Sequence, residues 1–213
     1  MSGVRGKFIT LEGGEGAGKS TLLQGLLAHL SQRGIDVLQT REPGGTALGE
    51  AVRALVLDAR QHGVCAESEA LLMFAARAQH VREVLRPALD AGRWVLCDRF
   101  TDASYAYQGG GRGMDMRVLA QLEAIATEGL RPDLTLLLDL PVAHGRARAR
   151  GRSAADRIER EEDAFFERVR ATYLARAAAE PQRFRVLDAS RTADQVLAAA
   201  VAALDAVRAG APA

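Results

Sequence analysis

Gly13-Gly14-Glu15-Gly16-Ala17-Gly18-Lys19-Ser20 is the stretch that decides the fold. It fits the pattern G-x-x-x-x-G-K-[ST], which is typical of phosphate-binding P-loops. The apolar, β-prone run Phe8-Ile9-Thr10-Leu11 precedes it, and leucines at helical spacing follow Thr21. The pattern therefore joins a strand to the N-terminus of a helix, where backbone N–H groups and the helix dipole favour an anion.

Each residue type in this loop has a physical role. Glycines let the backbone wrap phosphate oxygens without a clash from Cβ. Lys19 is placed to reach the β- and γ-phosphates, and the Ser20 hydroxyl is placed to ligate Mg²⁺. The chain has 26 arginines but only two lysines, Lys7 and Lys19, so a lysine kept here indicates a need for a compact ammonium group. We therefore expect Gly13 to Thr21 to bind ATP, and a glycine-rich turn without a ligand is the alternative.

Length and composition limit the classes of function. The 213 residues are enough for one domain with a large core, so we expect residues 1–213 to form a single domain. The formal net charge of +1 indicates no general attraction to nucleic acid or to an acidic membrane. Cys65 and Cys97 lack metal-site or redox-motif spacing, and no apolar run reads as a signal peptide or a membrane span. We expect a cytoplasmic protein without nucleic-acid or membrane partners.

Short apolar runs alternate with segments of helical period along the whole chain. The expected strands are Phe8–Leu11, Ile35–Leu38, Trp94–Arg99, Leu134–Leu140 and Phe184–Leu187. The expected helices run from the loop to Gly34, from Thr46 to about Leu57, from about Glu67 to Ala91, over Thr101–Gln108 and Asp115–Glu128, from Pro141, and over Asp163–Ala179 and Thr192–Arg208. This alternation predicts an α/β fold, a doubly wound five-stranded parallel sheet flanked by helices.

Proline and glycine modify two of these elements. Pro87 lies inside the long third helix, where it should bend or break the last turns. Gly109, Gly110 and Gly111, followed by Gly113, predict a flexible connection after the short fourth helix.

Charged residues lie at the carboxyl ends of the expected strands, where open α/β sheets bind ligands. The loop Thr40-Arg41-Glu42-Pro43-Gly44-Gly45-Thr46 follows the second strand, and Asp98-Arg99 ends the third. An aspartate at the end of a buried strand near a P-loop is the usual holder of Mg²⁺. We therefore expect Asp98 and Ser20 to bind the metal. A surface turn is the alternative for Asp98-Arg99, which the preceding apolar run disfavours.

Arginines are dense in Arg146-Ala147-Arg148-Ala149-Arg150-Gly151-Arg152, and Arg157 and Arg160 follow. These charges repel one another unless an anion is near. The segment predicts a lid, about residues 146–160, that closes over phosphates and supplies an arginine to the transferring group. A solvated charged segment in an arginine-rich protein is the alternative.

Several classes of protein use a P-loop. GTP switches need an Asn-Lys-x-Asp guanine reader, and this chain contains no asparagine. Motor and AAA-type ATPases usually carry an acid strand that ends in Asp-Glu, whereas this one ends in Asp98-Arg99. The strand-end charges and the arginine lid favour a small kinase. A regulator that binds ATP without turnover is the alternative.

Six motifs occur in order along the chain: Phe8–Gly13 leading into the loop, Thr40–Thr46, Asp98–Phe100, Ala106–Gly113, Arg131–Thr135 and Asp156–Glu159. Together they make the chain resemble the bacterial thymidylate kinase (dTMP kinase) family over nearly its whole length. The resemblance implies a P-loop nucleoside-monophosphate kinase architecture with a lid, and a homodimer. It also implies the transfer of a phosphoryl group from Mg-ATP to dTMP in the dTTP synthesis pathway. A kinase for another monophosphate, such as dUMP, is the alternative.

The resemblance further implies an acceptor site of charged and polar side chains. Its expected members are Arg99, Arg41, Arg53 and the orienting Glu42 for the phosphate, Glu15 and Tyr107 for the sugar, and Arg77, Ser104 and Gln108 for thymine. The family commonly stacks a phenylalanine on thymine four residues before the equivalent of Arg77. Met73 stands there in this chain and Phe74 follows it, so either side chain could cover the base. Phe74 is included in the expected site, with core packing as its alternative.

The family places its catalytic arginine either in the P-loop or in the lid. Gly16 stands at the P-loop position, so the resemblance implies the lid type, with Arg150 as the catalytic arginine and Arg146 as a candidate to stack on adenine. Lys19, Arg150 and Mg²⁺ are then expected to stabilise the charge on the moving phosphoryl group. Glu15 and Arg99 complete the expected catalytic set, and the roles of Arg152 and Arg157 stay open.

Overall fold

The structure is a computed structural model that describes residues 5–149 and 156–208. Its strands are β1 Phe8–Gly13, β2 Val37–Arg41, β3 Trp94–Asp98, β4 Leu134–Asp139 and β5 Phe184–Asp188. Its α-helices are α1 Lys19–Gln32, α2 Ala47–Leu57, α3 Ala66–His80, α4 Arg86–Asp90, α5 Thr101–Ser104, α6 Met116–Thr127, α7 Val142–Ala149, α8 Asp163–Ala179 and α9 Ala193–Arg208. Two π-helical segments are η1 Val81–Leu85 and η2 Tyr105–Gly111.

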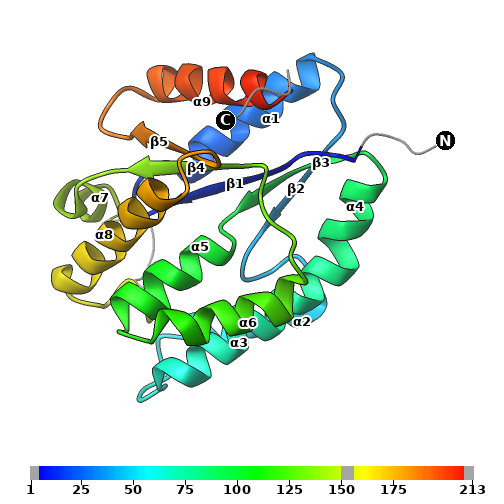
Figure 1. The fold of residues 1–213 in the computed structure, drawn as a ribbon. Coiled ribbons are helices and arrows are strands. Elements are labelled where there is room, and N and C mark those ends of the chain that lie inside the picture. The colour runs from blue at the N-terminus through cyan, green and yellow to red at the C-terminus, as the bar shows by residue number, and fades with distance from the viewer. Residues whose placement is uncertain (1–4, 150–155, 209–213) are drawn as a thin grey trace.

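The strands form one parallel sheet in the order β2-β3-β1-β4-β5 (Figure 1). This confirms the predicted doubly wound five-stranded sheet. The central strand β1 pairs with β3 and β4, so that Leu11 lies opposite both Asp98 and Leu136. Because all strands run the same way, the loop after β1 and the carboxyl end of β3 meet at one edge of the sheet.

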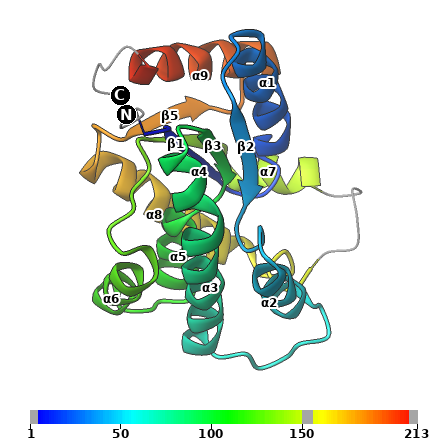
Figure 2. The same cartoon turned by 90° about the vertical axis from the view of Figure 1, so that its right-hand side faces the viewer.

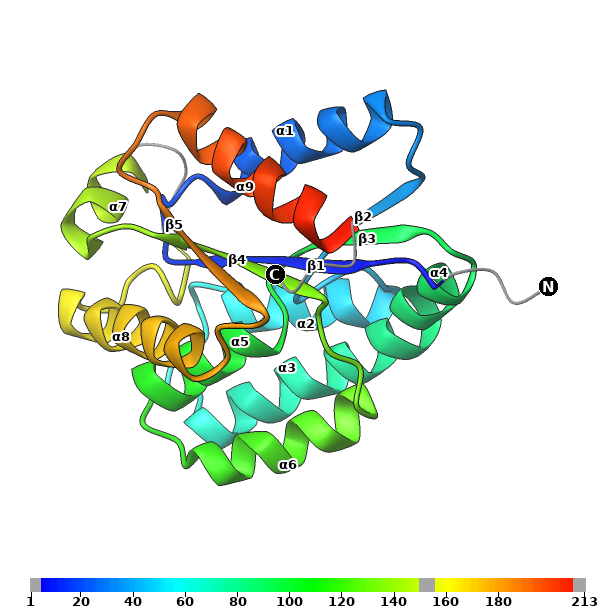
Figure 3. The same cartoon turned by 45° about the horizontal axis from the view of Figure 1, so that its top comes forward.

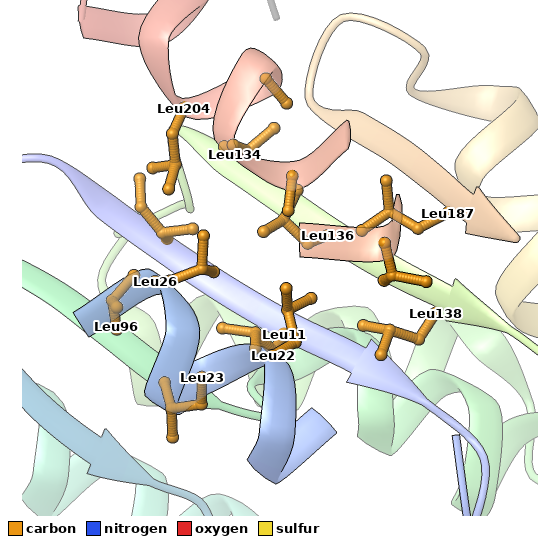
Figure 4. Packing of buried hydrophobic residues seen from close by; sticks show 14 of the residues in the cluster. Leu11, Leu22, Leu23, Leu26, Leu96, Leu134, Leu136, Leu138, Leu187 and Leu204 are labelled. Atoms are coloured by element: carbon orange, nitrogen blue, oxygen red, sulfur yellow. The ribbon is translucent and has the colours of Figure 1, made fainter. Parts of the chain in front are cut away.

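Helices cover both faces of the sheet. Helices α1 and α9 lie on one face, and α3, α5, α6 and α8 lie on the other (Figure 3). The largest core cluster fills the space between the sheet and α1 and α9, where Leu22 and Leu26 of α1 and Leu204 of α9 meet strand leucines (Figure 4). On the other face α2 lies beside α3 (Figure 2), and Val52 and Val56 pack on Ala76. Burial of these apolar faces fixes the helices that carry the site.

The long helix around Pro87 is not broken. It passes from α3 through η1 into α4, and Leu85 and Arg86 keep right-handed helical dihedral angles. In a regular α-helix the Pro87 ring would press on the carbonyl of Glu83, and Pro87 cannot donate a backbone hydrogen bond. A π-helical turn places the wider spacing just before the proline, which lets the helix continue.

The predicted flexible connection at Gly109–Gly111 is wrong. These residues belong to η2, which packs along α8. A Cβ on Gly110 would lie 2.0 Å from Thr172 Oγ1, and a Cβ on Gly111 would lie 2.5 Å from the Phe165 ring. The glycines therefore allow η2 and α8 to approach closely. Residues 109–111 are a packed helical segment and not a loop.

Part of the lid lies outside the described residues, because α7 ends at Ala149 and the structure resumes at Asp156. Arg150 and Arg152 are in the interval. Within the described ranges, no helix combines the length and the apolar character needed to cross a membrane.

Candidate active site

The loop between β1 and α1 has the backbone that its glycines predict. Gly16 has a φ of 68°, and a Cβ there would lie 2.1 Å from the Gly145 carbonyl oxygen at the start of α7. Gly18, with a φ of 94°, stands immediately before α1 in the left-handed region. The loop thus directs the N-terminus of α1, where a helix presents its first N–H groups, toward a cleft.

Lys19 folds back over this loop. Its Nζ donates to the carbonyl oxygens of Gly13 at 3.2 Å and Gly14 at 3.0 Å. Burial lowers the pKa of Lys19, and the positive charge of Arg99 lowers it further, while Glu15 and Asp98 oppose both effects. The ammonium group is therefore held in place before any phosphate arrives.

A cleft of about 290 Å³ opens beside the loop. The predicted site residues that line it are Glu15, Gly16, Ala17, Gly18, Lys19, Ser20, Thr21, Glu42, Arg53, Asp98, Arg99, Tyr107 and Gln108. Met73, Asp156, Ile158 and Glu159 line it as well. The predicted residues that lie outside its lining are Gly13, Gly14, Arg41, Phe74, Arg77, Ser104 and Arg146. One concave site therefore brings the P-loop together with most of the predicted acceptor residues.

Arg99 lies at the centre of a hydrogen-bond network in the cleft. Its Nη2 donates to Glu15 Oε1 and to the Tyr107 hydroxyl, both at 3.1 Å, and its Nη1 donates to the Tyr173 hydroxyl at 3.1 Å. Its φ of 71° is in the left-handed region, which costs a residue with a Cβ about 1 kcal/mol or more. The surrounding contacts hold a strained arginine with its guanidinium facing the cleft.

Glu12 is linked to Arg99 through Tyr173, which binds both residues. This fully buried carboxylate accepts from the Phe100 backbone N–H and from the Tyr173 hydroxyl, both at 2.7 Å. Burial, with the negative charge of Asp102 as the next cause, raises the pKa of Glu12 to about 7. The motifs predicted no role for Glu12, although an acid inside an apolar strand is a signal visible in the sequence.

Arg77 and Ser104 are brought together as predicted, but behind the cleft wall. Arg77 is 1% exposed, and it donates to Glu42 Oε2 at 2.7 Å, Ser104 Oγ at 3.0 Å and the Phe100 carbonyl at 3.0 Å. His80 donates from Nδ1 to Glu42 Oε1 at 2.9 Å. Arg77 and His80 thus hold the Glu42 carboxylate in place, and Glu42 also lines the cleft.

Phe74 does not face the cleft. It is 3% exposed in a core cluster with Tyr105 and Leu119, and its ring lies 4.6 Å from the Arg77 guanidinium carbon. Met73 lines the cleft instead. Successive residues of a helix point about 100° apart, so the side chain next to a cleft-facing one turns into the core. Phe74, included in the expected site, is therefore a core residue as its alternative had it, and of the two side chains only Met73 lines the cleft.

The two predicted phosphate-binding arginines of this region differ. Arg53 lines the cleft, where its Nη1 donates to the Pro43 carbonyl at 3.1 Å, and burial followed by the charge of Arg41 lowers its pKa. Arg41 is exposed and pairs with Glu50 at 2.9 Å. The structure thus brings Arg53 to the cleft and leaves Arg41 at its outer edge.

Arg146 lies on the other side of the P-loop. Its Nη1 donates to the Glu161 carbonyl at 2.6 Å, its Nε pairs with Asp163 at 3.1 Å, and its guanidinium carbon lies 5.2 Å from the Phe166 ring. With Gly13 and Gly14 it borders a small second hollow at the end of β4. The planar guanidinium of Arg146 therefore lies next to the P-loop. The predicted catalytic Arg150 lies outside the described residues.

The oxygen atoms beside Lys19 suit a magnesium ion. Asp98 Oδ1 is buried at the cleft and has no hydrogen-bond partner in the described part of the chain. Ser20 is exposed at the same cleft. Among residues 5–149 and 156–208 no three His, Cys, Asp or Glu side chains converge as a metal site. A two-oxygen protein contribution fits Mg²⁺, which keeps waters and binds substrate phosphates.

The last part of the lid, from Asp156, supplies acidic residues for which the sequence predicted no role. Asp156 Oδ1 accepts from the backbone N–H groups of Ile158 and Glu159, both at 2.8 Å. This turn places Asp156 and Glu159 in the cleft lining near Glu15. The motif was visible in the sequence, but its position over the cleft depends on long-range packing.

Comparison with known proteins agrees with this geometry. The family model described as "Thymidylate kinase" matches residues 11–200. The chain is 58% identical over 205 residues to a thymidylate kinase of Methylococcus capsulatus, covering 96% of this chain and 98% of that protein. It is 57% identical over 195 residues to one of Ectopseudomonas mendocina, covering 92% and 93%. The crystal structure of thymidylate kinase from Ehrlichia chaffeensis superposes with a TM-score of 0.77 at 32% identity, over 94% of this chain and 99% of that one.

Proposed function

The chain belongs to the thymidylate kinase family, and from this premise we propose that it transfers the γ-phosphoryl group of ATP to the phosphate of dTMP, giving dTDP and ADP for dTTP synthesis. The observation that carries the proposal is the shared cleft. The P-loop, Arg99 and Gln108 all lie on it, and the buried amide oxygen of Gln108 has no hydrogen-bond partner among the described residues. A donor phosphate and an acceptor base are therefore served from one concave site.

The proposed chemistry is positioning and charge stabilisation. The loop N–H groups and Lys19 bind the donor phosphates, and Arg99 and Arg53 hold the acceptor phosphate, whose oxygen is the nucleophile. Glu15 keeps the Arg99 guanidinium in its orientation through the 3.1 Å contact. Mg²⁺, held by Ser20 and Asp98, supplies positive charge to the donor phosphates when bound.

The acceptor base is proposed to be read by polar groups at the far end of the cleft. Gln108 Oε1 is a buried acceptor without a hydrogen-bond partner in the described residues, and it suits the N3–H of thymine. Met73 covers the base and Tyr107 packs against the deoxyribose. Arg77 has N–H donors beyond the three in use, which are proposed for thymine O4, and it holds Ser104 and Glu42 in place.

The lid carries the rest of the proposed catalytic machinery. Arg150 is the proposed catalytic arginine, on the strength of the family resemblance alone. Arg146 is the proposed partner of adenine, because its planar cation lies next to the loop that binds the donor. In this proposal residues 146–160 are an insertion in one P-loop kinase domain spanning residues 1–213, and the reaction takes place in the cytoplasm.

A homodimer is also proposed. Exposed large apolar side chains are present on neighbouring helices: Leu48 and Leu55 on α2, Leu71 on α3, and Val118 and Ile125 on α6. Ile125 is 75% exposed and Leu71 is 56% exposed, which is unfavourable in water. Analytical ultracentrifugation tests the dimer: a Leu71→Glu, Ile125→Glu double variant should sediment as a monomer, and a monomeric unmodified protein would contradict the proposal.

The function is tested by ADP release with Mg-ATP and a panel of monophosphates: dTMP, dUMP, dCMP, UMP, dGMP and AMP. Rapid release with dTMP, slower release with dUMP and near-background release with the others is the expected pattern. Preference for another monophosphate would leave the phosphoryl-transfer chemistry intact and overturn the base assignment. Tight ATP binding without release for any acceptor would overturn the kinase assignment.

A further inference from the structure

Glu69 is a buried carboxylate outside the cleft lining. It lies in the first turn of α3 with a fully buried side chain. Its carboxylate accepts from Gln108 Nε2 at 2.8 Å on Oε1, and from Arg112 Nη2 at 3.2 Å on Oε2, and it also pairs with Arg157. The position is therefore a junction between η2 and the last part of the lid.

The carboxylate is ionised. Burial alone would raise the pKa of Glu69, but the hydrogen bonds from Gln108 and Arg157 and the charge of Arg112 lower it below its usual value. An ionised carboxylate can only accept hydrogen bonds. Gln108 must therefore present its Nε2 group to Glu69, and the amide cannot turn over without placing two acceptors against each other.

The fixed amide determines what the cleft offers. With Nε2 bound to Glu69, Gln108 Oε1 is buried and has no hydrogen-bond partner in the two described ranges, and the residue Gln108 lines the cleft. Thymine carries a hydrogen at N3, whereas cytosine carries a lone pair there. An acceptor oxygen satisfies the first base and opposes the second, and an unmade bond of this kind changes affinity by about tenfold or more.

We propose that Glu69 is a specificity-determining, positioning residue that selects thymine over cytosine by locking the Gln108 amide with its oxygen toward the acceptor base. The proposal rests on the function proposed above, because it takes the base to lie at Gln108. It assigns base selection to a residue that never touches the substrate. Arg112 and Arg157 both lower the pKa of the Glu69 carboxylate, and Arg112 still does so when Arg157 is removed.

The test compares Glu69→Gln with Glu69→Asp. A glutamine at 69 can donate as well as accept, so the Gln108 amide is free to turn. The ratio of kcat/KM for dTMP to that for dCMP should fall by about tenfold or more, through a higher KM for dTMP and a gain with dCMP, while the KM for ATP stays within about twofold. Aspartate keeps an acceptor-only anion, so Glu69→Asp should retain the ratio even where overall activity falls.

A structural role alone gives a different result. If Glu69→Gln folds, as judged by its thermal unfolding, and loses activity equally toward dTMP and dCMP, the ratio is unchanged and the proposal is wrong. Arg157→Gln is the matched control, because it cuts a second contact to the same carboxylate while the Gln108 hydrogen bond remains. It is expected to keep the base ratio.

If Glu69→Gln does not fold, a measurement on the unmodified protein tests the proposal instead. The side-chain NH₂ resonances of Gln108, assigned by their loss in Gln108→Leu, should exchange with solvent at least about tenfold more slowly than those of an exposed glutamine. They should stay slow to exchange when dTMP binds. Fast exchange, in the free protein or with dTMP bound, would show that the amide is not locked. If the unmodified protein does not use dTMP, the proposed function fails, and this exchange still decides whether Glu69 orients the amide.

Discussion

The two ends of the cleft are built in different ways. At the proposed phosphate end the functional groups come from the continuous stretch Glu15–Thr21, and from Asp98, which ends the strand paired with β1, and Arg99, which follows it. The proposed base end, with Met73 and Gln108, and the nearby Asp156, Ile158 and Glu159 come from three distant parts of the chain. A local motif and strand pairing place the first set. Only the packing of α3, η2 and the last part of the lid places the second.

The two ends of the cleft also differ in the interactions that hold their residues in place. The P-loop is held by its own backbone and by Lys19, which donates to two loop carbonyls. The base end is held by the buried carboxylates of Glu42 and Glu69, each bound by arginine. Buried ion pairs are strongly destabilising when one partner is removed. The base end should therefore be more sensitive to substitutions that lie outside the cleft.

The largest effect is expected at the phosphate end. Lys19→Ala should lower kcat by about 10³-fold or more with every acceptor, because the lost charge acts on the transferring group and not on the base. Steady-state ADP release measures it. Lys7→Ala is the control, since Lys7 is a surface residue that pairs with Asp133 at 3.8 Å, and it should keep normal activity. A kcat within about tenfold of normal for Lys19→Ala would contradict the assignment.

The next effect is on the pH dependence of stability and comes from Glu12, which is linked to Arg99 through Tyr173. The pKa of Glu12 is raised from 4.5 to about 7, so the folded state binds more protons than the unfolded state between these values. Stability should therefore fall as pH rises through this window, by on the order of 3 kcal/mol. Urea unfolding of the unmodified protein and Glu12→Gln between about pH 4.5 and pH 8 measures it. The variant should lack this slope, and parallel curves would refute the expectation.

Neighbouring residues on α3 allow a direct comparison of cleft and core. Met73→Ala should raise the KM for dTMP about tenfold and leave the KM for ATP unchanged, because it removes the cover of the base. Phe74→Leu should instead lower the free energy of unfolding by about 1–2 kcal/mol, with the KM for dTMP kept within about twofold. Enzyme kinetics and urea unfolding on both variants are required. The reverse pattern would restore Phe74 to the acceptor site.

The smallest effect is expected at the outer edge. Arg41→Gln removes an exposed ion pair with Glu50, which should cost at most about 0.5 kcal/mol of stability. The KM for dTMP should change by less than about threefold, whereas Arg53→Gln, at the cleft, should raise it by about tenfold. A large KM effect for Arg41→Gln would mean that Arg41 turns inward when the phosphate binds.

The sequence was informative wherever the cause was local. The alternation of apolar runs with helical segments predicted the parallel sheet, and the loop glycines predicted the strand–loop–helix geometry. Strand ends in a parallel sheet converge, so the meeting of Asp98 and Arg99 with the loop followed from the fold class.

The direction in which each side chain points was harder to predict from the sequence. Phe74 and Met73 are adjacent in the sequence, and only the contact of α3 with η2 and α6 decides which one turns into the core. The glycines of η2 suggested flexibility because their close contact with α8 is a long-range property. The links from Glu42 to His80 and from Glu69 to Gln108 span 38 and 39 residues, and no local pattern indicates them.

The close contact between Gly16 and α7 has an evolutionary consequence. The family has a second arrangement, in which an arginine occupies the position of Gly16. Any side chain there would meet the Gly145 carbonyl at 2.1 Å and would have to adopt a φ of 68°. A side chain at position 16 therefore requires a second change that moves the first turn of α7. An arginine in the P-loop is at least two coupled changes away from the present sequence.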